Sequence, residues 1–348
     1  MPSARIPRIA VVIPAYNHGA YIAEAIRSVV TQDWPNLQLY VLDDGSQDDT
    51  VAVVEKTLDQ VSGVDCHFAT QKNVGSAVTL NRLIAGTDAD FVSILNSDDY
   101  YLPGRLKTMM AFADEHPFLA FSGVRFDAGA MASPEIGFED WYKGKLAYAL
   151  SLPSCGYALL TANLAISSGN FLFSRRLFDD VGGFNKELPL TQDWEFLLKA
   201  MRSTEPHLVP QRLLYYRVHE TNSFRELFDS RIEQSRQALA GFLEWSDLHA
   251  DNRLAPTPMT WRRFFQIFAR SCSPAFSADA IGNFMPDKLL NTNNSKQQGA
   301  ALDDMALSNM LLAAKARQQN LLKSTDVLLS DVASQWSMMR KEMDEHHA

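Results

Sequence analysis

The chain has 348 residues, of which 46% are apolar and 21% charged, and its formal net charge is −9. This composition is typical of a folded globular protein and excludes a largely disordered chain. The acidic balance argues against nucleic acid as a partner, because nucleic-acid-binding domains normally present a basic surface.

The first hundred residues alternate between short apolar runs and amphipathic segments. Strands are predicted at 9–13, 37–42, 66–69 and 90–95, and helices at 20–30, 50–58 and 76–85. Strands that alternate with helices of this size predict an α/β domain with a mixed, mainly parallel sheet flanked by helices. In such sheets the ligand lies beyond the carboxyl ends of the strands. We therefore expect residues 14–17, 43–46 and 96–99, which each follow a strand, to share one edge.

Residues 146–174 contain no charged side chain, although they are long enough to cross a bilayer. Pro153, Gly156, Asn163 and Asn170 interrupt this apolar segment. We interpret it as buried core or pocket lining. The pattern around it is less regular, with a strand predicted at 170–173 and a helix at 192–202.

The last third of the chain has a different character. Helices are predicted at 224–245, 261–270 and 300–345, with a polar linker at 251–258. We therefore divide the chain into an α/β domain, residues 1–223, and a mostly helical region, residues 224–348. The segment "WRRFFQIFAR" suits either an interfacial helix on an anionic membrane or a core helix with exposed arginines. The long terminal helix either packs on its own domain or forms a homo-oligomer.

Two acidic pairs follow predicted strands. Asp98 and Asp99 come after an apolar run, and half-buried carboxylates need a compensating charge. Mg²⁺ and Mn²⁺ supply it in sites that combine carboxylates with substrate phosphates, whereas the simpler alternative is a solvated turn. Asp43 and Asp44 either form a glycine turn or accept hydrogen bonds from a ribose or a base. No glycine-rich phosphate loop is present, which disfavours dinucleotide and P-loop sites.

Four segments together resemble the family 2 glycosyltransferases of the GT-A fold. They are "AVVIPAYNHGAYIAEAIRSVVTQDWPNLQLYVLDDGSQDDT", "NVGSAVTLNRLIAGTDADFVSILNSDDYYLPGRL", "GGFNKELPLTQDWEFLLKA" and "YYRVH". The resemblance covers residues 6–223, and the four motifs occur in the family's order. The last third lies outside it.

The resemblance implies a site for a nucleotide-diphosphate sugar that is UDP-, GDP- or dTDP-linked. The implied nucleotide-sugar-binding residues are Pro14, Ala15, Tyr16, Asn17, Asp43, Asp44, Asn73 and Asp98. Asp44 contacts the nucleoside in this interpretation, and Asp43 is the alternative. Mn²⁺ or Mg²⁺ is held by Asp99 and His219, with Asn96 standing where many relatives carry a further aspartate. The metal stabilises the charge on the departing nucleoside diphosphate.

The resemblance also implies inverting transfer, with Asp193 as the base that deprotonates the acceptor hydroxyl. Glu195 is the alternative base, and Gln192 occupies a position where relatives often carry glutamate. A charge at the start of a helix is the simpler interpretation of Asp193, and the two are compatible. The processive synthases' QxxRW-type motif is absent, which favours transfer of single sugars.

We therefore predict a glycosyltransferase acting on a glycan or lipid-linked acceptor in cell-surface polysaccharide or glycoconjugate synthesis. The alternatives are a nucleotidyltransferase that makes the activated sugar and a non-catalytic nucleotide-sugar-binding scaffold. The N-terminus lacks a signal-peptide pattern and the three cysteines show no CxxC spacing. Both features predict a cytoplasmic protein, with peripheral contact at the inner face of the membrane as an option.

Overall fold

The computed structural model describes residues 5–113, 117–127, 130, 137–151, 155–160, 162–219 and 228–249. The predicted linker at 251–258 and the predicted helices at 261–270 and 300–345 lie outside these residues.

Eight strands form one sheet in the order β3-β2-β1-β4-β7-β6-β8-β5. Their bounds are β1 Ile9–Ala15, β2 Leu37–Asp43, β3 Asp65–Thr70, β4 Phe91–Ile94, β5 Tyr100–Tyr101, β6 Leu119–Phe126, β7 Phe171–Ser174 and β8 His207–Tyr216. The pairs β1–β2, β1–β4, β2–β3 and β6–β8 are parallel, whereas β4–β7, β6–β7 and β5–β8 are antiparallel. The predicted class, a mixed and mainly parallel sheet with flanking helices, is confirmed.

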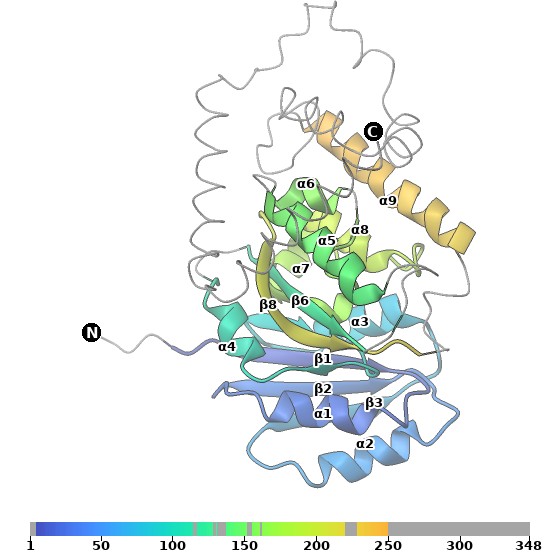
Figure 1. The fold of residues 1–348 in the computed structure, drawn as a ribbon. Coiled ribbons are helices and arrows are strands. Elements are labelled where there is room, and N and C mark those ends of the chain that lie inside the picture. Colours follow the sequence, from blue (N-terminus) through green and yellow to red (C-terminus); the bar gives the residue numbers. More distant parts are fainter. Residues whose placement is uncertain are drawn as a thin grey trace, which may run out of the picture.

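The helices cover both faces of this sheet, with α1 and α2 below it and α5, α6 and α8 above it in Figure 1. Their bounds are α1 Ile22–Val30, α2 Thr50–Leu58, α3 Ser76–Ala85, α4 Arg105–Met110, α5 Phe138–Ser151, α6 Cys155–Leu159, α7 Arg175–Val181, α8 Gln192–Ala200 and α9 Phe228–Leu248. In helix α1 the apolar residues recur at helical spacing and lie on one buried face, namely Ile22, Ala25, Ile26 and Val29. This spacing is the reason why the helix could be predicted from the sequence.

Most described residues of the charge-free segment 146–174 are buried, as expected for core or pocket lining. It contributes the end of α5, helix α6, a 3₁₀ turn at Ser168–Asn170 and strand β7. Every residue of β7 is buried. Within the described residues, no helix has the length and apolarity needed to cross a bilayer.

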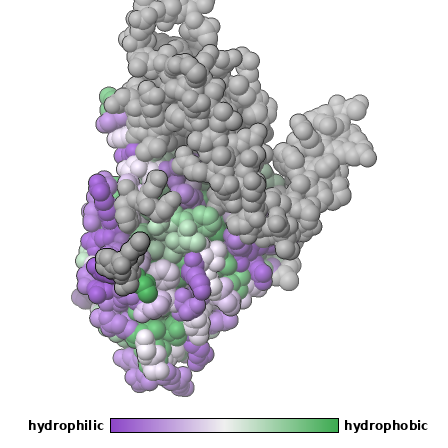
Figure 2. Space-filling view, turned by 90° about the vertical axis from the view of Figure 1, so that its left-hand side faces the viewer, coloured by the Kyte–Doolittle hydropathy of each residue, from purple (hydrophilic) through white to green (hydrophobic). Residues whose placement is uncertain are grey.

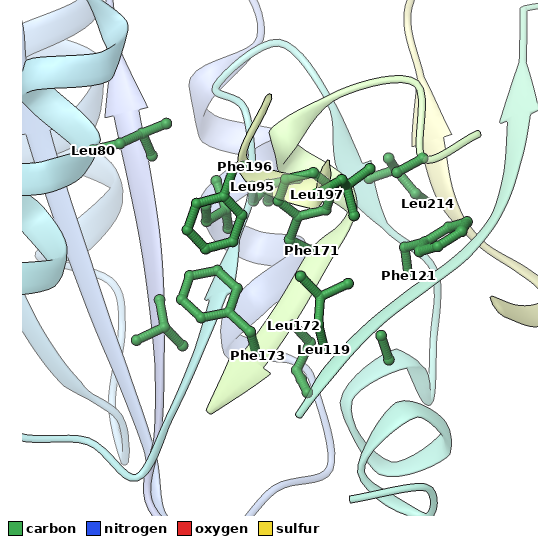
Figure 3. Close-up of a cluster of buried hydrophobic side chains, with 14 of the residues drawn as sticks. Leu80, Leu95, Leu119, Phe121, Phe171, Leu172, Phe173, Phe196, Leu197 and Leu214 are labelled. Atoms are coloured by element: carbon green, nitrogen blue, oxygen red, sulfur yellow. The ribbon is translucent and has the colours of Figure 1, made fainter. Parts of the chain in front are cut away.

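An aromatic cluster fixes helix α8 against the sheet (Figure 3). The ring centroid of Phe196 in α8 lies 6.0 Å from that of Phe171 and 5.2 Å from that of Phe173, both in β7. It also stacks on Phe184 at 4.4 Å. Such aromatic pairs contribute about 0.5–1.5 kcal/mol each beyond the area they bury. The first turn of α8, which carries Asp193, is therefore held in a defined place.

Helix α9 packs against α8 on the side away from the sheet. Its Ala238, Leu239 and Phe242 are buried. The guanidinium of Arg202, just after α8, lies 4.8 Å from the ring centre of Trp245. The predicted helix at 224–245 is thus confirmed over its described part, where α9 continues to Leu248 and packs on the α/β domain. The division at residue 223 stays a prediction.

The face shown in Figure 2 is mainly polar in its described part, with separate apolar patches between the polar side chains. Four large apolar side chains of the described residues are strongly exposed, namely Ile6, Tyr16, Val74 and Leu248. Tyr16 follows β1 directly, and Val74 precedes α3. Both belong to loops at the carboxyl edge of the sheet, where an exposed apolar side chain can contact a bound ring.

Candidate functional site

The loop after β1 is joined to the loop after β2 by hydrogen bonds. The backbone N–H of Asn17 donates to Ser46 Oγ at 2.8 Å, and Asn17 Oδ1 accepts from the N–H of Gln47 at 2.7 Å. Asn17 has a φ of 52°, a left-handed conformation that asparagine tolerates better than most residues. The predicted residues Pro14, Ala15, Tyr16 and Asn17 therefore lie beside the first acidic pair, as expected from their place at the strand ends.

Asp43 and Asp44 are both buried, and each carboxylate organises a different loop. Asp43 Oδ2 accepts from the N–H groups of Gly45 and Ser46, both at 3.0 Å. Asp44 accepts from Gln71 Nε2 at 2.8 Å and from the N–H groups of Val74 and Gly75, both at 2.9 Å. A carboxylate has about four acceptor positions, so these bonds leave capacity for a ligand. Asn73 is exposed on the loop that Asp44 holds.

The second acidic pair is divided between two environments. Asp98 Oδ2 lies 3.1 Å from His219 Nε2 and 3.9 Å from His18 Nε2. Asp99 is fully buried, and its Oδ1 accepts the backbone N–H of Arg217 at 3.0 Å. Asp98 therefore faces two imidazoles, whereas Asp99 faces the backbone that carries one of them.

Pairing between two short strands explains this convergence. Tyr100 and Tyr101 of β5 pair with Tyr215 and Leu214 of β8, so the residues just before β5 meet those just after β8. Arg217 reinforces the contact, since its guanidinium donates to the Asp98 carbonyl at 2.5 Å and forms an ion pair with Glu24. Its charge also lies 5.1 Å from the ring centre of Tyr21 and 5.0 Å from that of Tyr100.

The pKa values of Asp98 and Asp99 are shifted in opposite directions. Burial raises the pKa of Asp99 well above its usual value, and the neighbouring Asp98 charge adds to this. Burial also acts to raise the pKa of Asp98, but the hydrogen bond with His219 and the proximity of His18 outweigh it, so the net pKa is lowered. Asp98 is consequently the member of the pair that ionises more readily.

His18, Asp98 and His219 form the one group of potential metal ligands found among the described residues. One ligand atom from each lies within 4.8 Å of the others. Imidazole nitrogen and carboxylate oxygen are both donors to divalent transition metals, so this set fits such an ion. The predicted ligand His219 belongs to the group and the predicted ligand Asp99 does not. Asp98, predicted as a nucleotide-sugar contact, occupies that place.

His18 was missed from the sequence. It directly follows the "PAYN" segment, and strand β1 ends at Ala15, so its position at the sheet edge was predictable. A single histidine carries no ligand signal without a partner, and its partners come much later in the chain, after β4 and after β8.

The candidate base Asp193 lies in the first turn of α8. Its Oδ2 accepts from Asn163 Nδ2 at 2.9 Å, and its Oδ1 accepts from the N–H of Trp194 at 2.7 Å. Thr191 occupies the N-cap position of α8 without a capping hydrogen bond from its side chain. Glu195, the alternative base, is paired with Lys199 at 3.3 Å. Burial raises the pKa of Glu195 in spite of this lysine.

A chain of contacts ties α8 to the acidic loops. Gln192 Nε2 donates to Ser76 Oγ at 2.6 Å, and Ser76 follows Gly75, whose N–H binds Asp44. The 3₁₀ turn before β7 also approaches the second acidic loop, because a Cβ on Gly169 would lie 2.9 Å from the nitrogen of Asn96. The helix that carries the predicted base is thus linked to the first acidic pair, and the turn before β7 lies against the second acidic loop.

Known proteins support this architecture. Residues 10–182 match the family model "Glycosyl transferase family 2". An uncharacterized glycosyltransferase of Rickettsia typhi is 24% identical over 241 residues, which cover 68% of this chain and 72% of the relative. The alignments with the Rickettsia conorii and Rickettsia felis relatives cover 46% of the length of those proteins.

Two solved structures have the same fold at low sequence identity. Staphylococcus aureus TarS 1–349 in complex with UDP-GlcNAc is 18% identical, with a TM-score of 0.52 and coverage of 93% of this chain and 92% of that one. The mannosyltransferase PcManGT of Pyrobaculum calidifontis, in complex with GDP-Man and Mn²⁺, is 18% identical, with a TM-score of 0.53 and coverage of 91% and 88%. The predicted GT-A fold is therefore confirmed, and the chain belongs to glycosyl transferase family 2.

Proposed function

We propose that this glycosyltransferase moves a sugar from a nucleoside-diphosphate donor to a hydroxyl acceptor with inversion at the anomeric carbon. The observation that carries the proposal is the meeting of Asp98, His219 and His18 at the carboxyl edge of the sheet, beside the loops that Asp43 and Asp44 organise. The two fold neighbours described above were solved with UDP-GlcNAc and with GDP-Man, which supports the donor class.

The nucleoside is proposed to bind between the loops after β1 and β2. Tyr16 is exposed there and offers an aromatic surface to a base, and Val74 is exposed on the loop held by Asp44. Asp43 and Asp44 both retain acceptor capacity for a base N–H or a ribose hydroxyl. Asp44 remains our choice for this contact and Asp43 the alternative, as the sequence predicted. Asn73, which is exposed on the same loop, is also proposed to contact the nucleotide sugar.

Mn²⁺ or Mg²⁺ is proposed to bind at Asp98 and His219 rather than at Asp99 and His219. The Asp98 carboxylate lies 3.1 Å from His219 Nε2, whereas the Asp99 carboxylate accepts a backbone N–H and has no exposed surface. A bound cation supplies positive charge that stabilises the departing nucleoside diphosphate. Asp99 then has a positioning role, since it fixes the backbone two residues before His219.

Asp193 is proposed to take the proton of the acceptor hydroxyl. As the acceptor oxygen bonds to the anomeric carbon, the bond from that carbon to the phosphate oxygen breaks and its electron pair leaves with the nucleoside diphosphate. The proton passes to the Asp193 carboxylate, which Asn163 and the N–H of Trp194 orient. The acceptor class predicted from the sequence, a glycan or a lipid-linked sugar, stays a prediction, as do the pathway and the location in the cell.

The test is a panel of UDP-, GDP- and dTDP-sugars with Mn²⁺ and mixed oligosaccharide and lipid-linked acceptors. Nucleoside diphosphate release that depends on acceptor supports the proposal, and NMR of the product then reports the anomeric configuration. Pyrophosphate release would instead identify a nucleotidyltransferase. Donor binding without turnover across the whole panel would identify a scaffold.

A further inference from the structure

We infer that His18 is a third protein ligand of the divalent cation proposed above and that it favours Mn²⁺ and Co²⁺ over Mg²⁺. The inference rests on the proposed metal site at Asp98 and His219. It assigns a role to a residue that the acidic motifs do not contain, and it concerns the selectivity of the site rather than its existence.

The geometry brings His18 to the same carboxylate oxygen that His219 contacts. His18 Nε2 lies 3.9 Å from Asp98 Oδ2, and the rings of His18 and His219 are nearly perpendicular with centroids 5.8 Å apart. Metal–nitrogen bonds of about 2.1 Å place two ligand atoms of one ion roughly 3–4 Å apart. The observed separations, all within 4.8 Å, therefore need only a small side-chain rotation to close around an ion.

The other ring nitrogen of His18 is already engaged. Nδ1 lies 2.7 Å from Ser97 Oγ, and Ser97 is buried beside Asp98. Histidines that bind metals usually hold their second ring nitrogen in such a hydrogen bond, because it fixes the tautomer and directs the free lone pair at the metal. Ser97 thus orients His18 so that Nε2 points toward Asp98.

The backbone of His18 is fixed as firmly as its ring. Its N–H donates to Thr50 Oγ1 at 2.8 Å, and its carbonyl accepts the N–H groups of Tyr21 and Ile22, both at 2.9 Å. The next residue, Gly19, donates to Asp48 Oδ2 at 3.0 Å. The ring therefore projects from a loop that is anchored to the starts of both α1 and α2, which makes a precise ligand position attainable.

The ligand chemistry decides which ion this arrangement prefers. Mg²⁺ takes oxygen ligands in near-ideal octahedral geometry and seldom uses imidazole. Transition metals accept nitrogen readily, and affinity for nitrogen sites rises from Mn²⁺ to Co²⁺. Two imidazoles and one carboxylate should therefore bind Mn²⁺ and Co²⁺ more tightly than Mg²⁺, and loss of one imidazole should narrow that difference.

The test measures binding of metal alone to the full chain. Free Mn²⁺ is followed by its electron paramagnetic resonance signal and Mg²⁺ by competition, in the wild type and in His18→Ala, His18→Gln and His219→Ala. His67→Ala is the matched control, because that ring stacks on Tyr40 between strands β3 and β2 and does not belong to the group of potential ligands. We expect both His18 variants to weaken Mn²⁺ binding about tenfold or more. Mg²⁺ affinity should change much less, and the control should bind as the wild type.

X-ray absorption of the Mn²⁺-loaded wild type gives an answer that does not depend on the folding of a variant. Two imidazoles in the ligand shell support the inference, and one imidazole overturns it. Wild-type Mn²⁺ affinity in both His18 variants, together with a loss in His219→Ala, would also overturn it and leave the proposed metal site standing. Wild-type affinity in all three variants would remove the metal site itself, whatever the outcome of the nucleoside diphosphate assay.

Discussion

The Asp99 carboxylate accepts the backbone N–H of Arg217 at 3.0 Å, so a side chain after β4 holds the chain just after β8. The contact positions the segment that carries His219, two residues further on. Asp99 is fully buried, and any substitution there changes the partner of a part-buried backbone donor.

Two substitutions of Asp99 should therefore differ in their effect on stability. Asp99→Asn keeps an oxygen for the Arg217 N–H and removes a charge that is costly to bury, so we expect its free energy of unfolding to equal or exceed that of the wild type. Asp99→Ala leaves that donor unpaired and should be destabilised by about 1–3 kcal/mol. Urea denaturation of both variants measures the difference. Equal stabilities for the two would show that the hydrogen bond to Arg217 contributes little.

Asp98→Asn should instead abolish stabilisation by metal. A ligand at 100 times its Kd raises the free energy of unfolding by about 2.7 kcal/mol when it binds only the folded state. Excess Mn²⁺ should therefore raise the Tm of the wild type, and EDTA should reverse the rise. In Asp98→Asn the shift should vanish, whereas Asp99→Asn should retain most of it. An equal Mn²⁺ shift in wild type and Asp98→Asn would exclude Asp98 as a ligand.

The different roles of Asp98 and Asp99 show which features of the molecule could be predicted from the sequence and which could not. Strands and helices up to residue 95 were predictable because their hydrophobic periodicity is local, and the carboxyl-edge rule then placed three loops together. Strands β6 and β8 were missed. Their pairing has register shifts between Ser122 and Val124, and β8 contains Pro210, so neither has the pattern of a regular strand.

The site was predictable to the level of the motif but not of the side chain. Asp98 and Asp99 have the same charge and are adjacent, so composition and spacing cannot tell which one faces His219. The short pairing of β5 with β8 decides it, and a two-residue strand leaves almost no pattern in the sequence. The same pairing brings His219 beside His18, which is why the second imidazole emerged only from the structure.

Gly45, in the turn after the first acidic pair, should tolerate no side chain. Its φ is +79°, and a Cβ would lie 2.8 Å from the backbone nitrogen of Asn73. Gly63 is a matched control, because its φ is +81° and a Cβ there would have no neighbour within 4 Å. We expect Gly63→Ala to lose about 1–2 kcal/mol from the left-handed backbone alone. Gly45→Ala should lose clearly more, measured by urea denaturation, and should also weaken donor binding. Similar losses in both would mean that the Asn73 loop moves freely.

Glu195 should give the wild type a distinctive pH dependence. Burial raises its pKa above the usual 4.5, although Lys199 acts to lower it. A carboxyl whose pKa is higher in the folded state is more readily ionised in the unfolded chain. Stability therefore falls as pH rises from the unfolded pKa to the folded one. Glu195→Gln should therefore become more stable than the wild type as the pH rises through that interval. Urea unfolding at a pH below the interval and at a pH above it measures the difference. The gain should be larger in the Lys199→Met background, because Lys199 then no longer lowers the pKa of Glu195. If the wild type and Glu195→Gln had the same free energy of unfolding at every pH, the raised pKa of Glu195 would be contradicted.

Asp193→Asn tests the proposed base. The amide keeps the size of the carboxylate and an oxygen for Asn163, but it cannot take a proton from the acceptor. We expect kcat for sugar transfer to fall at least about 100-fold, the lower range for loss of a general base. Donor KM and the Mn²⁺-dependent rise in Tm should change little, because the metal ligands are untouched. Glu195→Gln is the matched control, since Glu195 lies in the same helix and is paired with Lys199, and it should keep most of the activity. If Glu195→Gln lost the activity and Asp193→Asn kept it, the base would be Glu195. Near-normal turnover in both variants would mean that neither carboxylate accepts the proton.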